Sequence, residues 1–129
     1  LHDALAAASG TAPRRSTRTS AYNNLSAQLP IDPASGQIVA GGVREQASRC
    51  LANIKAILES IDHAMADIVK VNIFLKDIAD IDAVDEAYAA FFPGGVPARR
   101  TVGVSALPGD ALVQIEVVAA NEEGTPPRA

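Results

Sequence analysis

An amphipathic segment from Val43 to Ile61 is the feature of this sequence that most constrains its fold. Its apolar residues recur at steps of three and four, and charged residues occupy the opposite face. The apolar set is Val43, Ala47, Cys50, Leu51, Ile54, Ile57, Leu58 and Ile61. This period predicts a helix over 43–61 that buries one face. The chain therefore needs a second layer for that face to pack against.

The next segment, Ile68–Leu75, is a candidate for that layer. Its alternating residues form one set of Val69, Val71, Ile73 and Leu75 and another of Ile68, Lys70, Asn72 and Phe74. Both sets are apolar enough to predict a central strand. Ile81–Phe92 predicts a second helix, with Asp80 as its candidate N-cap. The inner stripe of that helix is Ile81, Val84, Tyr88 and Phe91.

Further strands are expected toward both ends of the chain. They are Arg14–Tyr22 and Leu25–Leu29, joined by a tight turn at Asn23-Asn24, and Ala98–Val104 and Leu112–Ala119, joined by a turn at Leu107–Asp110. The order β-β-α-β-α-β-β predicts an α+β fold with one mixed sheet and both helices on one face. We expect one domain over 1–129, with loose tails at 1–13 and 122–129. The other sheet face would expose apolar side chains, which predicts a homo-oligomer.

Charge and composition argue against several classes of function. The net charge is −4, so no broad basic field favours nucleic acid as a partner, and the basic cluster at Arg14–Arg18 is interpreted as a solvated strand or tail. The single cysteine, Cys50, fits a reducing compartment, and His2 and His63 form no metal motif. No apolar run reaches membrane-spanning length, and the start of the chain lacks a signal-peptide pattern. We therefore expect a cytoplasmic protein with no membrane segment and no metal.

The segment Val96–Val118 carries the candidate chemistry. It places Arg99 and Glu116 at the inward-facing ends of two strands that are expected to be neighbours. Arginine matches a carboxylate with a planar fork of donors, and a partly buried glutamate can transfer a proton. The pair predicts a small acid/base site that binds a carboxylate. The alternative is that Arg99 and Glu116 form a structural ion pair, and the pattern alone leaves both interpretations open.

A series of motifs from Ser26 to Ala119 resembles the RidA/YjgF family of reactive-intermediate (enamine/imine) deaminases, also described as L-PSP endoribonucleases. No single motif is specific, but their order and spacing together are. They are Ser26-Ala27-Gln28-Leu29-Pro30, Asp32-Pro33, Gly36, Gln46-Ala47, Leu51 with Asn53-Ile54-Lys55-Ala56-Ile57-Leu58, Asp67-Ile68-Val69-Lys70, Phe74-Leu75-Lys76-Asp77, Tyr88, Phe91-Phe92, Pro97-Ala98-Arg99, Leu107-Pro108 and Ile115-Glu116.

The resemblance implies a chorismate-mutase-like homotrimer, with the sheets in a central barrel and sites in clefts between subunits. It implies that Arg99 binds the carboxylate of a small metabolite, that Glu116 holds or activates a water, and that the backbone at Ala27 orients the ligand. Thr101 lies two residues beyond Arg99, on the same strand face, and is expected to line that pocket. The implied reaction is hydrolysis of 2-aminoacrylate or 2-iminobutanoate, as the imine, to a 2-keto acid and ammonia. No cofactor is expected, because an imine carbon is already electrophilic.

The sequence departs from the family pattern at four places. Arg100-Thr101 replaces the usual Ser-Cys, Gly103 replaces a glutamate, and Asp85 replaces an asparagine near the start of the second helix. The first hairpin is short, and Tyr22 is the nearest counterpart of the family's tyrosine there. Asp85 and Tyr22 are therefore candidate substrate contacts. The alternatives are a deaminase of an aminomuconate-like intermediate and a non-catalytic trimer that binds 2-keto acids or acts as a chaperone. An endoribonuclease is ranked last, because the chain is acidic and lacks a histidine pair.

Overall fold

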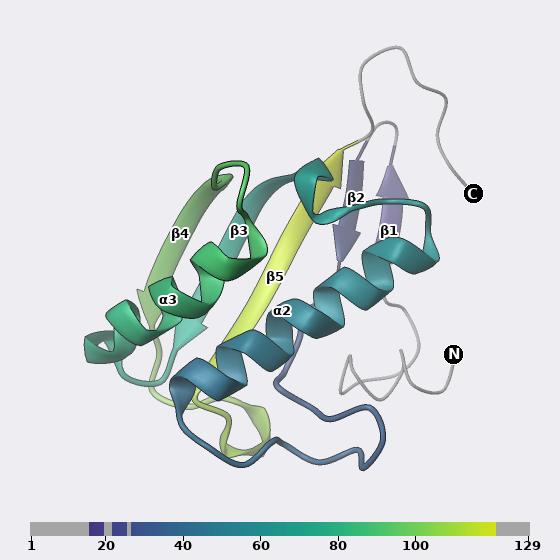
Figure 1. Ribbon diagram of the computed structural model, residues 1–129. Coiled ribbons are helices and arrows are strands. Elements are labelled where there is room, and N and C mark those ends of the chain that lie inside the picture. Colours follow the sequence, from purple (N-terminus) through teal and green to yellow (C-terminus); the bar gives the residue numbers. More distant parts are fainter. Residues whose placement is uncertain (1–15, 20–21, 26, 121–129) are drawn as a thin grey trace.

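The computed structural model describes residues 16–19, 22–25 and 27–120 as one five-stranded sheet with two helices. The strands are β1 (Ser16–Thr19), β2 (Tyr22–Leu25), β3 (Ile68–Leu75), β4 (Ala98–Gly103) and β5 (Val113–Ala120), and the helices are α2 (Val43–Ser60) and α3 (Ile81–Phe91). Short 3₁₀ turns lie at Met65–Asp67, Ile78–Asp80 and Pro108–Asp110. The strand order is β1-β2-β5-β3-β4, and both helices cover the same face (Figure 1). The predicted α+β class and element order are confirmed.

The strand β3 lies between β5 and β4, as predicted for a central strand. It pairs antiparallel with β5 and parallel with β4. One part of the predicted alternation is wrong. Val69, which the alternation groups with Val71, Ile73 and Leu75, is 44% exposed, whereas Ile68 of the other set is buried with 5% of its surface exposed. The register shifts between Ile68 and Lys70, and this irregularity exchanges the faces of the first two residues.

The two helices follow the sequence pattern closely. Val43 begins α2 as predicted, and the Glu45 carboxylate accepts a hydrogen bond from the Gly42 N–H at 3.0 Å, which stabilises the first turn. In α3, Val84 and Tyr88 of the predicted inner stripe are buried. Both helices pack onto the sheet and form the main core with the inward residues of β3 and β5. The sheet's contribution includes Val71, Ile73, Leu75, Val113, Ile115 and Val117.

The first hairpin differs from the prediction. Asn23 and Asn24 do not form a turn; they lie inside β2, where they pair with β1 on one side and with Ala119 and Val118 on the other. Pairing on both edges of β2 outweighs the turn preference of asparagine. The strand predicted to begin at Leu25 and end at Leu29 is also wrong in its extent, because β2 already ends at Leu25. Beyond Leu25, Gln28 forms only an isolated bridge with Ile115. The predicted tails at 1–13 and 122–129 lie outside the described residues.

The strands β4 and β5 are not neighbours. The expectation that the strands carrying Arg99 and Glu116 lie side by side is therefore wrong. After β3 the chain crosses over through α3 and returns parallel to β3, so β4 becomes an edge strand. Residues 107–110 then carry the chain past the end of β3 to its other side. Two backbone hydrogen bonds mark this crossing, from the Val104 N–H to the Leu75 carbonyl at 2.8 Å and from the Lys76 N–H to the Leu112 carbonyl at 3.0 Å.

The sheet face opposite the helices, which we call the open face, points away from the viewer in Figure 1. Across β4, β3 and β5 it carries three registered rows of side chains. The rows are Ala98, Lys70 and Val118; Arg100, Asn72 and Glu116; and Val102, Phe74 and Gln114. No helix in the described part of the chain is long and apolar enough to cross a membrane.

Candidate functional site

Arg99 lies on the edge strand β4 and faces the helices. Its Nε–H donates to the Thr101 hydroxyl at 2.9 Å, and its Nη2 forms an ion pair with the Asp85 carboxylate on α3. The Arg99 guanidinium also lies over the Tyr88 ring, 5.0 Å from the ring centroid. We call Arg99, Thr101, Asp85 and Tyr88 the Arg99 cluster. The prediction that Thr101 shares a face with Arg99 is confirmed.

The local sequence explains how this cluster forms. Arg99 and Thr101 are two residues apart on a strand and therefore share a face. Asp85 and Tyr88 are three residues apart on a helix and also share a face. This face of α3 contacts Arg99 of β4 through both Asp85 and Tyr88. The i, i+3 spacing of Asp85 and Tyr88 is the sequence signal that identifies Tyr88 as a contact of Arg99, a role that sequence reasoning missed.

Tyr88 supports Arg99 from the core side. Only 2% of its surface is exposed, and its ring packs against Phe92 with 4.7 Å between centroids. Burial raises the pKa of the Tyr88 phenol, and the positive charge of Arg99 acts in the opposite direction. The Tyr88 hydroxyl has no hydrogen-bond partner among the described residues. The buried Tyr88 ring thus provides a fixed aromatic surface on which the Arg99 guanidinium can stack.

Asp85 makes the Arg99 cluster nearly neutral. The Asp85 side chain is 48% exposed and the Arg99 side chain 20% exposed, so solvent reaches both. Arginine normally offers its fork to a ligand carboxylate. Here the Asp85 carboxylate of the same chain already forms an ion pair with Nη2 of Arg99. The structure therefore places Asp85 in contact with the proposed anchor, so that an incoming anion must share Arg99 with Asp85 or displace it.

Glu116 lies on the open face, in the middle of β5. The Asn72 amide on β3 donates to the Glu116 carboxylate at 3.0 Å. Arg100 on β4 is registered with Asn72 from the other side. These three residues, which we call the Glu116 cluster, line a pocket of about 160 Å³ together with Ile73, Phe74 and Val102.

The predicted pairing of Arg99 with Glu116 within one chain is wrong. Arg99 is registered with Val71, which is registered with Val117, and this row faces the helices. Glu116 belongs to the next row, which faces the open side. The strand β3 also lies between β4 and β5. Neither a shared intrachain site nor a structural ion pair of Arg99 with Glu116 forms, because the two side chains project from opposite faces of the sheet.

The remaining candidate residues fall in different places. The Gln28 N–H donates to the Ile115 carbonyl at 2.7 Å. Ala27 directly precedes Gln28 and Glu116 directly follows Ile115, so this hydrogen bond brings the backbone at Ala27 close to Glu116. Tyr22 belongs to β2, paired with Ala120, and its side chain lies outside the described part. Cys50 is core, as predicted: its thiol donates to the Gln28 carbonyl at 3.4 Å, and burial raises its pKa.

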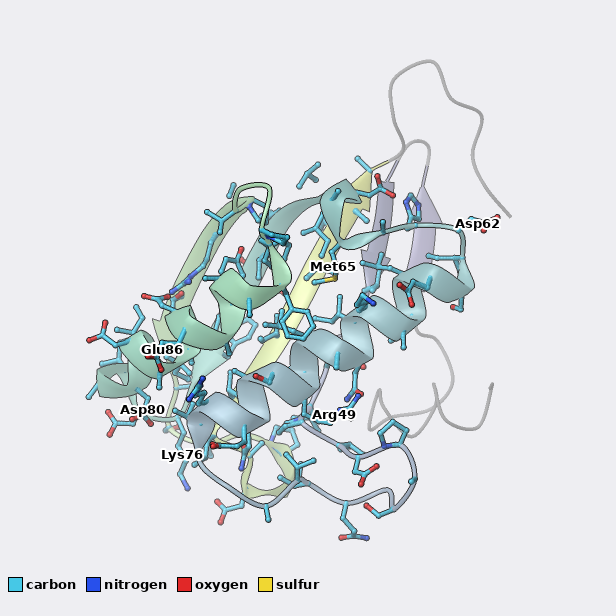
Figure 2. All side chains as sticks on the ribbon, in the orientation of Figure 1. Arg49, Asp62, Met65, Lys76, Asp80 and Glu86 are labelled. Atoms are coloured by element: carbon cyan, nitrogen blue, oxygen red, sulfur yellow. The ribbon has the colours of Figure 1, made fainter. Side chains whose placement is uncertain are left out.

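A larger cavity, about 680 Å³, lies away from both clusters. It is lined mainly by apolar residues from the end of α2, the turn at Met65 and the end of α3. Met65 is labelled in Figure 2, which also shows Arg49 on α2 and Glu86 on α3. The charged residues in its lining are Lys55 and Glu59, which form an ion pair with each other at 3.2 Å. Within the described residues, no group of three or more His, Cys, Asp or Glu side chains could hold a metal ion.

Comparisons with known proteins agree on one family. The family model described as Endoribonuclease L-PSP matches residues 3–121. A RutC family protein of Pyrococcus horikoshii is 44% identical over 98 residues, covering 76% of this chain and 78% of that protein. A 2-iminobutanoate/2-iminopropanoate deaminase of Capra hircus is 43% identical over 95 residues, covering 74% of this chain and 69% of that protein.

Solved structures give the same result. The YjgF gene product of E. coli superposes with a TM-score of 0.80 at 34% identity, covering 86% of this chain and 89% of that one. RidA from the Antarctic bacterium Psychrobacter superposes with a TM-score of 0.79 at 32% identity, covering 83% of this chain and 86% of that one. The mixed sheet with two helices is thus the arrangement of these structures.

Proposed function

We propose that this chain, which belongs to the RidA/YjgF (endoribonuclease L-PSP) family, hydrolyses small reactive imines to 2-keto acids and ammonia. Substrates of this class are 2-iminobutanoate and the imine tautomer of 2-aminoacrylate. The observation that carries the proposal is the Arg99 cluster, in a chain 43% identical to a deaminase of such imines. Arg99 rests on Tyr88 and is held by Thr101, so its fork is oriented before a ligand arrives.

In the proposed reaction Arg99 binds the substrate carboxylate and Glu116 activates a water. The water oxygen forms a bond to the imine carbon, and its proton passes through Glu116 to the imine nitrogen. In the resulting carbinolamine the hydroxyl proton passes through Glu116 to the amino nitrogen. The C–N bond then breaks to release ammonia, and the C=O bond of the keto acid forms. The imine carbon is already electrophilic, so the protein contributes mainly orientation and proton transfer.

Arg99 and Glu116 lie on opposite faces of the sheet, and this leads to a proposal about assembly. A site that uses both residues must take them from two subunits, because one chain cannot bring them together. We propose a homotrimer of the chorismate-mutase type, in which the open faces surround a central barrel. Half-buried Phe74, Val102 and Val118 on the open face support this, since such side chains favour a covered position. Light scattering that finds a stable monomer at micromolar concentration would remove the shared site.

The decisive experiment measures keto acid released from 2-aminoacrylate that a second enzyme generates in the assay. The chain should increase keto-acid release above the spontaneous rate. Arg99→Ala should remove that increase, because the substrate carboxylate loses its partner. A chain with no effect on the rate that still binds 2-oxobutanoate would instead be a non-catalytic 2-keto-acid-binding protein. Two features favour this second candidate: Thr101 stands where the family pattern has a cysteine, and the Asp85 carboxylate contacts Arg99.

A further inference from the structure

Arg100 shares a row of the open face with Asn72 and Glu116. The register pairs Asn72 with Arg100 on one side and with Glu116 on the other. Neighbouring strands are about 4.8 Å apart, so the backbones of Arg100 and Glu116 are separated by about 10 Å. Their side chains extend from the same face and line the same pocket of about 160 Å³. This spacing leaves room for a small ligand between the two charged groups.

Arg100, Asn72 and Glu116 do not satisfy all of one another's hydrogen-bonding groups. Asn72 donates to Glu116 at 3.0 Å and holds that carboxylate in place. The Arg100 guanidinium makes no hydrogen bond or ion pair within the part of the chain that the structure describes. Arginine presents several donors in one plane and is suited to a carboxylate. The Glu116 cluster thus has a fixed acid/base group and an unused anion-binding group in one pocket.

We propose that Arg100 binds a second carboxylate of the substrate, so that this chain acts on imines of dicarboxylic 2-keto acids. The inference rests on the proposed function, in which Arg99 of one subunit binds the first carboxylate beside Glu116 of another. A substrate with a single carboxylate would leave Arg100 without a partner. A carboxylate at the far end of the substrate fills the pocket and offsets the charge of Arg100.

The test compares two keto-acid ligands, 2-oxoglutarate with two carboxylates and 2-oxobutanoate with one. Calorimetry gives the ratio of their dissociation constants for the wild type, Arg100→Gln and Lys70→Gln. Lys70 is a matched control, because it is an exposed cation on the same open face outside the pocket. The wild type and Lys70→Gln should prefer 2-oxoglutarate. Arg100→Gln should lower this preference about tenfold, the usual cost of losing a charge-assisted contact, with 2-oxobutanoate binding retained.

A wild type without preference, or the same preference in Arg100→Gln, would overturn the inference. So would an equal loss of both ligands in a folded Arg100→Gln variant, because that would make Arg100 structural. If Arg100→Gln does not assemble, NMR of the wild type decides: the Arg100 Nε–H signal should shift with 2-oxoglutarate and not with 2-oxobutanoate, and the reverse refutes the assignment. Arg99→Lys tests the proposed function separately. Unchanged 2-oxobutanoate binding in that variant would contradict the Arg99 anchor, whatever Arg100 does.

Discussion

The ion pair between Asp85 and Arg99 makes a quantitative prediction about ligand affinity. A carboxylate that binds Arg99 comes close to the Asp85 carboxylate, which contacts the same guanidinium. Asp85→Asn removes the negative charge but keeps a side-chain oxygen that can accept a hydrogen bond from Arg99. The substitution should therefore leave Arg99 in position and remove the repulsion between Asp85 and the ligand.

The size of the effect follows from the exposure of the pair. Two charges about 4 Å apart interact by about 1 kcal/mol in bulk water and by about 4 kcal/mol near a protein surface. The Asp85 side chain is 48% exposed, so the lower value applies. A gain of about 1 kcal/mol corresponds to about fivefold tighter binding. The expected result is that Asp85→Asn binds 2-oxobutanoate about fivefold more tightly than the wild type.

Calorimetry at two salt concentrations tests the mechanism behind this gain. Screening is weak at about 0.01 M ionic strength and strong at about 1 M, so the advantage of Asp85→Asn should shrink in high salt. The control is Asp82→Asn, which removes an exposed acid from the first turn of the same helix. Equal affinity of Asp85→Asn and the wild type in low salt would show that Asp85 does not oppose the ligand. The same gain in Asp82→Asn would show a general charge effect instead.

Three further predictions concern single residues. Arg99→Lys keeps the charge but loses the planar fork, so we expect most activity and most 2-oxobutanoate binding to be lost, and normal binding by calorimetry would contradict the anchor role. Glu116→Gln should bind 2-oxobutanoate nearly normally but turn over about a hundred- to ten-thousand-fold more slowly in the keto-acid assay, because proton transfer is lost; unchanged turnover would reduce Glu116 to a structural partner of Asn72. Cys50 is buried and its pKa is raised, so iodoacetamide should label it only after urea unfolds the chain, and rapid labelling of the folded protein would show that the helix stripe opens.

The parts of the fold that could be predicted are those set by local periodicity. The stripe of α2 and the alternation of β3 each extend over several turns or residues, so a single exception does not change the pattern. The predictions failed where tertiary pairing decides. Asn23-Asn24 has turn residues, yet it lies in a strand paired on both edges. The alternation grouped Val69 with Val71, Ile73 and Leu75, which are buried, but a register shift that no residue pattern indicates turns Val69 to solvent.

The candidate site could be predicted residue by residue but not as an arrangement. Alternation along the strand placed Thr101 on the same face as Arg99. Whether Glu116 shares a face with Arg99 depends on the register of two different strands against β3, and periodicity within one strand does not contain that information. Because the chain inserts β3 between β4 and β5, the residue that shares a row with Glu116 is Arg100.

Mixed trimers offer the sharpest test of a site shared between subunits. An Arg99→Ala chain keeps Glu116, and a Glu116→Gln chain keeps Arg99, so each variant trimer alone should be inactive. When the two are unfolded together in equal amounts and refolded, about a quarter of the interfaces should receive Arg99 from one chain and Glu116 from the other. Those interfaces should restore a corresponding share of wild-type activity. The two variants refolded apart and then combined are the control. If both residues acted within one chain, no mixture would contain an intact site, and persistent inactivity of the refolded mixture would therefore refute the shared arrangement.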